Sequence, residues 1–114
     1  MSDNVSEKVV LQRVRNRIIE VLELFSDDDS FQLAISNLEY WEDWVSLENL
    51  KFFLPPVFTE SEVSEIRSVH IVWEQVYPGT QRTSEEWLAL TKAAKKALSI
   101  FYKRGLLPED SEIA

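Results

Sequence analysis

Apolar residues recur at every third or fourth position in three separate stretches of this sequence. The three stripes are Leu11, Val14, Ile18, Leu22 and Phe25; Val63, Ile66, His70, Trp73 and Tyr77; and Trp87, Leu90, Ala94, Ala97, Leu98 and Phe101. This spacing places the apolar side chains on one face of an α-helix. The sequence therefore predicts three long helices.

Local signals mark where these helices begin and end. The first helix is predicted to run from Val5 to Phe25, with Arg17 and Glu20 spaced to pair on its surface. Capping boxes beginning at Thr59 and Thr83 open the other two helices. Gly105 occupies the position after the last helix, where a left-handed residue is favoured.

The β-branched run at residues 69–72 would also suit a strand. We favour a helix, because the apolar period continues for several turns on both sides of this run.

The segment between the first two long helices is less regular. Ser26–Ser30 contains three consecutive aspartates, which we interpret as helix-capping residues because an EF-hand loop would need a glycine. From Phe31 the apolar spacing is compatible with a helix through Val45 or with one that ends near Asn37. Ser46 could cap a further short helix, and Pro55 and Pro56 end regular structure.

The predicted fold is all-α: one domain over residues 1–114, an antiparallel helical bundle of three long helices and a shorter, irregular second helical element. The ends, residues 1–4 and 109–114, are expected to be frayed. Two glycines and four prolines supply too few turns for a many-stranded sheet. No cysteine, signal peptide or apolar run of about 20 residues is present, which favours a cytoplasmic protein without a membrane span.

Charge is unevenly distributed along the chain. The formal net charge is −8, and twelve acidic residues face a single base, Lys51, between Ile18 and Ile66. Such a field repels nucleic acid and anionic membranes and attracts basic partners. Lys92, Lys95, Lys96 and Lys103 are better explained as the solvated face of the last helix than as a helix-turn-helix surface.

Residue types that carry catalysis are scarce. One histidine and no cysteine nearly exclude nucleophilic triads, and nothing in the sequence points to a Ser–Lys pair. Two carboxylates could hydrolyse a glycoside, but that chemistry needs a deep sugar cleft, which a bundle of this size rarely offers. Two glycines are too few for a glycine-rich phosphate-binding loop. His70 and Glu74 could share a divalent ion, but packing is the favoured role of a lone histidine on an apolar stripe. The expectation is a protein that is not an enzyme and uses no metal or cofactor.

Aromatic and acidic residues crowd the stretch from Leu38 to Phe58. We assign Trp41, Phe52 and Phe53 to the core. The partner-binding residues are predicted to be Glu39, Tyr40, Glu42, Asp43, Trp44 and Glu48, because exposed tyrosine and tryptophan strengthen interfaces and acids select a basic partner.

An arginine-containing amphipathic helix (Arg13, Arg15 and Arg17), an acidic middle, a capped Glu-rich helix (residues 59–65) and an Ala-rich closing helix (residues 89–97) follow one another. This order resembles the small acidic all-helical immunity proteins of bacterial polymorphic toxin systems. The resemblance implies a protein that binds and occludes a basic toxin, and it carries over no individual residue. The alternative is a homo-oligomeric assembly subunit that uses the same aromatic patch.

Overall fold

The computed structural model describes residues 6–46, 48–77 and 84–113, and regular structure in these ranges is entirely helical. The elements are α1 (Glu7–Ser26), η1 (Asp28–Ser30), α2 (Phe31–Ser36), α3 (Glu39–Trp44), η2 (Asn49–Phe52), α4 (Glu60–Val76) and α5 (Glu85–Phe101), where η marks 3-10 turns. The prediction of an all-α fold is confirmed. None of the helices in the described ranges has both the length and the apolar character to cross a membrane.

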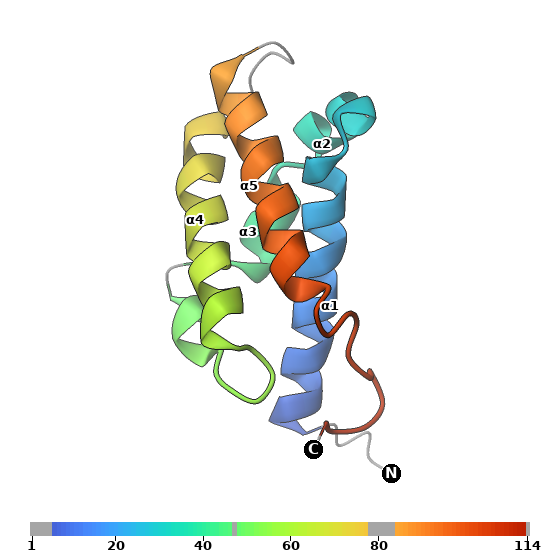
Figure 1. Ribbon diagram of the computed structural model, residues 1–114. Coiled ribbons are helices and arrows are strands. Elements are labelled where there is room, and N and C mark those ends of the chain that lie inside the picture. The colour runs from blue at the N-terminus through green and yellow to red at the C-terminus, as the bar shows by residue number, and fades with distance from the viewer. Residues whose placement is uncertain (1–5, 47, 78–83, 114) are drawn as a thin grey trace.

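Helix α5 lies between α1 and α4 and packs extensively against both, as Figure 1 shows. The core contains fully buried side chains from each long helix, among them Phe25, Ile66 and Phe101. Ala94 and Ala97 are also fully buried, and their small size permits close approach of the neighbouring helices. Helix α3 lies against α1 and closes the remaining side of the core.

The predicted caps are largely confirmed. Thr59 and Glu62 form the reciprocal capping box at the start of α4, and Gly105 has φ +70° after α5. The cap of α5 is Ser84, whose hydroxyl accepts from the Trp87 N–H at 3.1 Å. The predicted box at Thr83 lies outside the described residues, as do the predicted frayed residues 1–4.

The second helical element is interrupted between Ser36 and Glu39. The Leu38 carbonyl accepts a hydrogen bond from the indole N–H of Trp73 at 2.8 Å and from the Trp41 N–H at 3.2 Å. These bonds hold Leu38 in a turn, so the interpretation in which the helix stops near Asn37 is correct and a new helix begins at Glu39. Trp73 of α4 therefore helps to set the break between α2 and α3.

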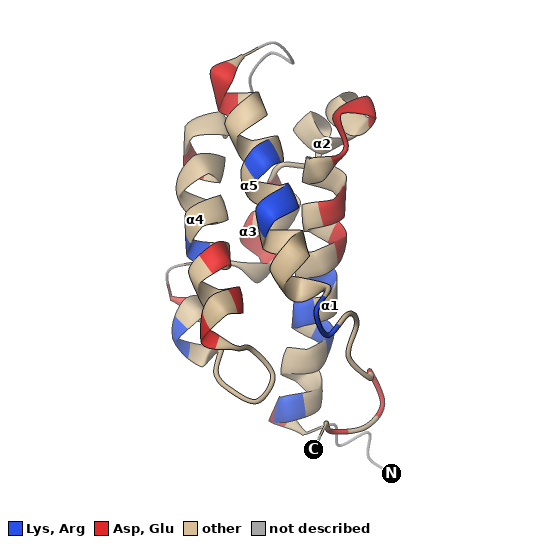
Figure 2. Cartoon of the chain, viewed as in Figure 1, with Lys and Arg blue, Asp and Glu red and all other residues tan. Residues whose placement is uncertain are grey.

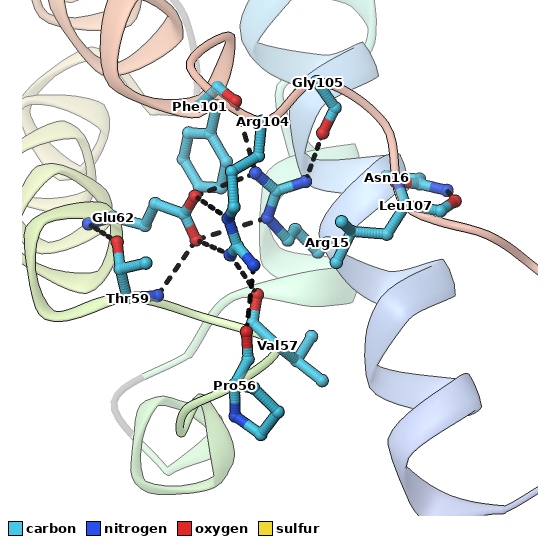
Figure 3. A network of polar contacts seen from close by, with 10 residues as sticks. All are labelled: Arg15, Asn16, Pro56, Val57, Thr59, Glu62, Phe101, Arg104, Gly105 and Leu107. Carbon is cyan, nitrogen blue, oxygen red and sulfur yellow. Dashed lines mark hydrogen bonds and ion pairs between the residues drawn. The ribbon is translucent and has the colours of Figure 1, made fainter. Parts of the chain in front are cut away.

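A buried ion-pair network joins α1, α4 and the segment after α5 (Figure 3). Arg15 is fully buried, and its guanidinium donates to both carboxylate oxygens of Glu62, at 3.2 and 2.8 Å, and to the Gly105 carbonyl at 2.6 Å. Arg104 also pairs with Glu62, at 2.7 Å. It also donates to the carbonyls of Pro56 and Val57 at 2.9 and 2.6 Å. The network thereby fixes the proline loop beside the start of α4.

The same network makes the free energy of unfolding depend on pH in the acidic range. Burial alone would raise the pKa of Glu62, but hydrogen bonds from Arg15, Arg104 and the Thr59 N–H outweigh it and hold that pKa below the ordinary value of 4.5. The unfolded chain thus protonates Glu62 at a higher pH than the folded protein does. The stabilisation is complete above pH 4.5 and is lost as the pH falls through the lowered pKa.

We therefore expect the urea midpoint to decrease on acidification below this pH, followed by circular dichroism. A Glu62→Gln variant should show a shallower decrease, because it has no carboxylate to protonate at this position. An equally steep pH dependence in the variant would contradict this role for Glu62.

The end of the chain is held against α1, which differs from the predicted frayed tail. The Gln12 amide donates to the carbonyls of Pro108 and Ser111, both at 2.7 Å, and its oxygen accepts from the Ile113 N–H at 3.0 Å. Arg17 pairs with Glu109 at 2.9 Å. Residues 109–113 are therefore part of the folded unit, because polar side chains of α1 bond their backbone and side chains.

Candidate functional site

A long surface groove runs beside α1 and consists of three adjoining hollows of about 510, 320 and 440 Å³. The first and second hollows share Leu11 and Phe52, and the second and third share Asp43 and Trp44. We call the three together the α1–α3 groove. One wall is α1 from Glu7 to Leu24, and the other is formed by residues between Tyr40 and Val57.

Trp41 anchors the α3 wall of this groove. Its side chain is fully buried, and its indole N–H donates to Nδ1 of His70 on α4 at 3.1 Å. On a helix, the residues on either side of a buried position point to other faces. Tyr40, Asp43 and Trp44 have i, i+3 and i+4 spacing on the same short helix, so their side chains share one of these faces, and all three line the third hollow.

The six predicted binding residues separate into two sets. Tyr40, Asp43 and Trp44 meet in the third hollow with Arg17, Glu20, Val21 and Leu24 of α1. Tyr40 remains 47% exposed, whereas Trp44 is partly buried against the core. Glu39, Glu42 and Glu48 are exposed to solvent but do not line this hollow.

The core assignment is confirmed for Trp41 and Phe53 and is wrong for Phe52, which is 55% exposed. In a 3-10 turn, residues three apart share a face. Leu50 and Phe53 of this segment point inward, so Phe52 points outward into the groove. The Lys51 ammonium lies 5.2 Å from the centroid of the Phe52 ring.

Exposed apolar residues extend the groove beyond the predicted site. Val10, Phe52 and Leu54 are all exposed at the first hollow, beside Pro55 and Pro56. Val10 and Leu54 were not among the predicted site residues. Val10 widens the apolar stripe of the first helix, so its periodicity suits a core residue as well as a site residue. Leu54 precedes the proline pair and has no periodic signal.

Most acidic residues of the stretch from Ile18 to Ile66 have partners within the protein. Glu20 pairs with Arg17 at 2.7 Å, Glu65 lies 4.0 Å from Lys96, and Asp28 accepts from the Trp87 indole at 3.0 Å. The hydroxyl of Tyr102 donates to Glu23, and this hydrogen bond raises the pKa of Tyr102 to about 12. Figure 2 shows the acids spread over several elements rather than over one face.

A subset of these acids is unpaired. Within the described part of the stretch, the carboxylates without a hydrogen-bond or ion-pair partner are Glu39, Glu42, Asp43, Glu48 and Glu60. The first four are predicted binding residues, on α3 or just before η2. Asp43 lies where the second and third hollows join. The basic residues of the groove differ, since Lys8 and Arg17 have the acidic partners Glu112 and Glu109.

His70 is buried and packed, as the sequence indicated. Its Nδ1 accepts from Trp41, its ring stacks on Trp73 with centroids 5.6 Å apart, and its Nε2 lies 3.7 Å from Glu74. In the part of the chain that is described, no three His, Cys, Asp or Glu side chains are grouped to hold a metal ion.

Comparisons of the chain with protein-family models, with curated proteins and with solved structures give no match. Any assignment of function therefore depends on the chemistry of the surface itself.

Proposed function

We propose that this protein is a non-enzymatic binding protein that sequesters a basic protein partner at the α1–α3 groove. The observation that carries the proposal is the set of unpaired carboxylates on and beside α3, next to the partly exposed rings of Tyr40 and Trp44. Apart from Glu60 at the start of α4, the other acids of the stretch are used in caps, ion pairs or hydrogen bonds. Those on α3 repel one another without compensation inside the protein, and a cationic partner would relieve that repulsion.

An immunity-type inhibitor of a basic toxin is the specific form of this proposal. Binding needs no cofactor, metal, nucleic acid or membrane, and the protein would act in the cytoplasm. In this proposal the three long helices pack antiparallel. Helix α3 is held at one side of them and is the recognition element. Occlusion of a toxin requires a rigid recognition surface, which the Trp41 anchor supplies.

Charge reversal on α3 tests the proposed site. We expect Glu42→Lys/Asp43→Lys to slow association with the basic partner about tenfold at low salt, because exposed charges steer the encounter. The partner is first recovered by low-salt affinity purification from the cell that makes the protein, and rates are then measured by stopped-flow. Raising salt to 0.1 M, where the screening length is about 10 Å, should reduce the difference in association rate between this variant and the unaltered protein.

Glu60→Lys/Glu86→Lys is the matched control, because it changes the net charge equally at exposed acids in the first turns of α4 and α5, away from α3. It should slow association much less than the α3 variant, and both variants should keep the far-UV circular dichroism of the unaltered protein. An on-rate that falls equally in the two variants would remove α3 as the recognition element.

Self-association is the competing function, and one observation favours it. Val10, Phe52 and Leu54 form an apolar cluster at the end of the groove that is furthest from α3. Such a cluster could pack against a second copy. Light scattering after size exclusion decides this point: a monomer at micromolar concentration excludes a stable oligomer.

A further inference from the structure

We infer that the α1–α3 groove binds one basic amphipathic helix of the partner, with its apolar face in the hollows and its basic flank on α3. This inference rests on the proposed function and specifies the kind of segment that is recognised. The three hollows follow one another along α1, and neighbouring hollows share lining residues.

The length of the groove fits a helix of several turns. Its α1 wall runs from Glu7 to Leu24, which spans about 25 Å at 1.5 Å per residue. A helix of about 17 residues has the same length. Its apolar side chains, repeating every three or four residues, would enter successive hollows beside Leu54, Phe52 and Trp44.

The walls of the groove favour a helix over an extended segment. Recognition of an extended peptide depends on main-chain hydrogen bonds to a free strand edge, and the described part of the chain contains no strand. Both walls are mainly helices and turns, whose backbone groups bond within their own elements. A helical ligand makes its backbone hydrogen bonds internally and needs only side-chain contacts with the groove.

The charges on the two walls of the groove predict which flank of the bound helix faces α3. On the α1 wall, Lys8, Arg17 and Glu20 have intramolecular partners, and the remaining charged residue, Glu7, lies in the first hollow at the end of the groove furthest from α3. On the opposite wall Asp43 is unpaired at the junction of two hollows, and Glu39 and Glu42 lie on the same helix. Lysine or arginine should therefore lie along the flank of the ligand that faces α3.

The probe is a synthetic amphipathic peptide of about 18 residues, built from leucine, lysine and alanine with leucine on one helical face. A scrambled peptide of identical composition has its leucines distributed around the helix. A third peptide keeps the leucine pattern but carries glutamate in place of lysine. Fluorescence anisotropy of each labelled peptide measures binding to the full chain.

We expect the basic amphipathic peptide to bind at least tenfold more tightly than the scrambled or acidic peptide. Phe52→Ser and Asp43→Asn should each weaken its binding about fivefold or more. Leu88→Ser on α5 is the matched control for Phe52→Ser, because Leu88 is equally exposed, at 56%, outside the groove. Glu60→Gln is the control for Asp43→Asn, and both controls should bind as the unaltered protein does.

The peptides separate failure of this inference from failure of the proposed function. Equal affinity for the basic amphipathic and scrambled peptides would overturn helix recognition while leaving an acidic binding surface in place. Equal weakening by Leu88→Ser and Phe52→Ser would also overturn it, because binding would then not be in the groove. Absence of binding by both basic peptides at millimolar concentration would contradict the inference and the acidic recognition surface together.

Discussion

Glu62→Ala is expected to lower the free energy of unfolding by about 3–5 kcal/mol, because it leaves the buried guanidinium of Arg15 without a counter-charge. Arg15 is completely buried and cannot lose its proton, so it would remain as a buried charge without a counter-ion. The carboxylate also accepts from Arg104 and from the Thr59 N–H, and these donors lose their acceptor. Urea unfolding at pH 7 followed by circular dichroism measures the loss.

Glu60→Ala is the control, since Glu60 lies in the same first turn of α4 and is exposed without a side-chain partner. It should cost less than about 1 kcal/mol. The double variant Arg15→Met/Glu62→Leu should be more stable than Glu62→Ala, because no buried charge remains. A Glu62→Ala variant within about 1 kcal/mol of the unaltered protein would show that the network contributes little to stability.

Trp41→Ala is expected to destabilise the protein by about 3–5 kcal/mol, the cost of removing a large, fully buried ring. The same substitution removes the hydrogen bond to His70 and the contact with the Phe25 ring, whose centroid lies 6.2 Å away. Because Trp41 anchors α3, the substitution should also weaken binding at the groove. Thermal unfolding and the peptide-binding assay measure the two effects on the same sample.

Trp41→Phe separates the hydrogen bond from the packing. It keeps a buried ring but leaves Nδ1 of His70 without its donor, at an expected cost of about 1–3 kcal/mol. Tyr40→Phe is the control on the exposed side of α3 and should be close to neutral. If Trp41→Ala costs no more than Tyr40→Phe, α3 is not held by this residue.

Elements that depend on neighbouring residues could be predicted from the sequence. The 3–4 residue period located all three long helices, and the capping box at Thr59 set the start of α4. The Arg17–Glu20 pair, three residues apart, forms as expected at 2.7 Å. In each case the partners lie within one or two helical turns, so local geometry alone brings them together.

The site was only partly predictable. The sequence placed Tyr40, Asp43 and Trp44 in one candidate patch, and the structure brings all three to one hollow. The α1 wall, including Val10 and Arg17, was missed because it lies far away in the sequence. Phe52 was misassigned to the core because the crowding of aromatic rings does not show which of them face inward, and here Leu50 and Phe53 face the core while Phe52 is 55% exposed.

By itself, the sequence determined the helical class, the positions of the long helices and the concentration of negative charge, because periodicity, capping and charge are properties of short stretches. Only the tertiary structure decided that Arg15 is buried against Glu62, 47 positions away, and that the tail packs on α1. It also decided which carboxylates remain unpaired. A charge acquires its role from the groups that surround it, and those groups come together only when distant segments pack.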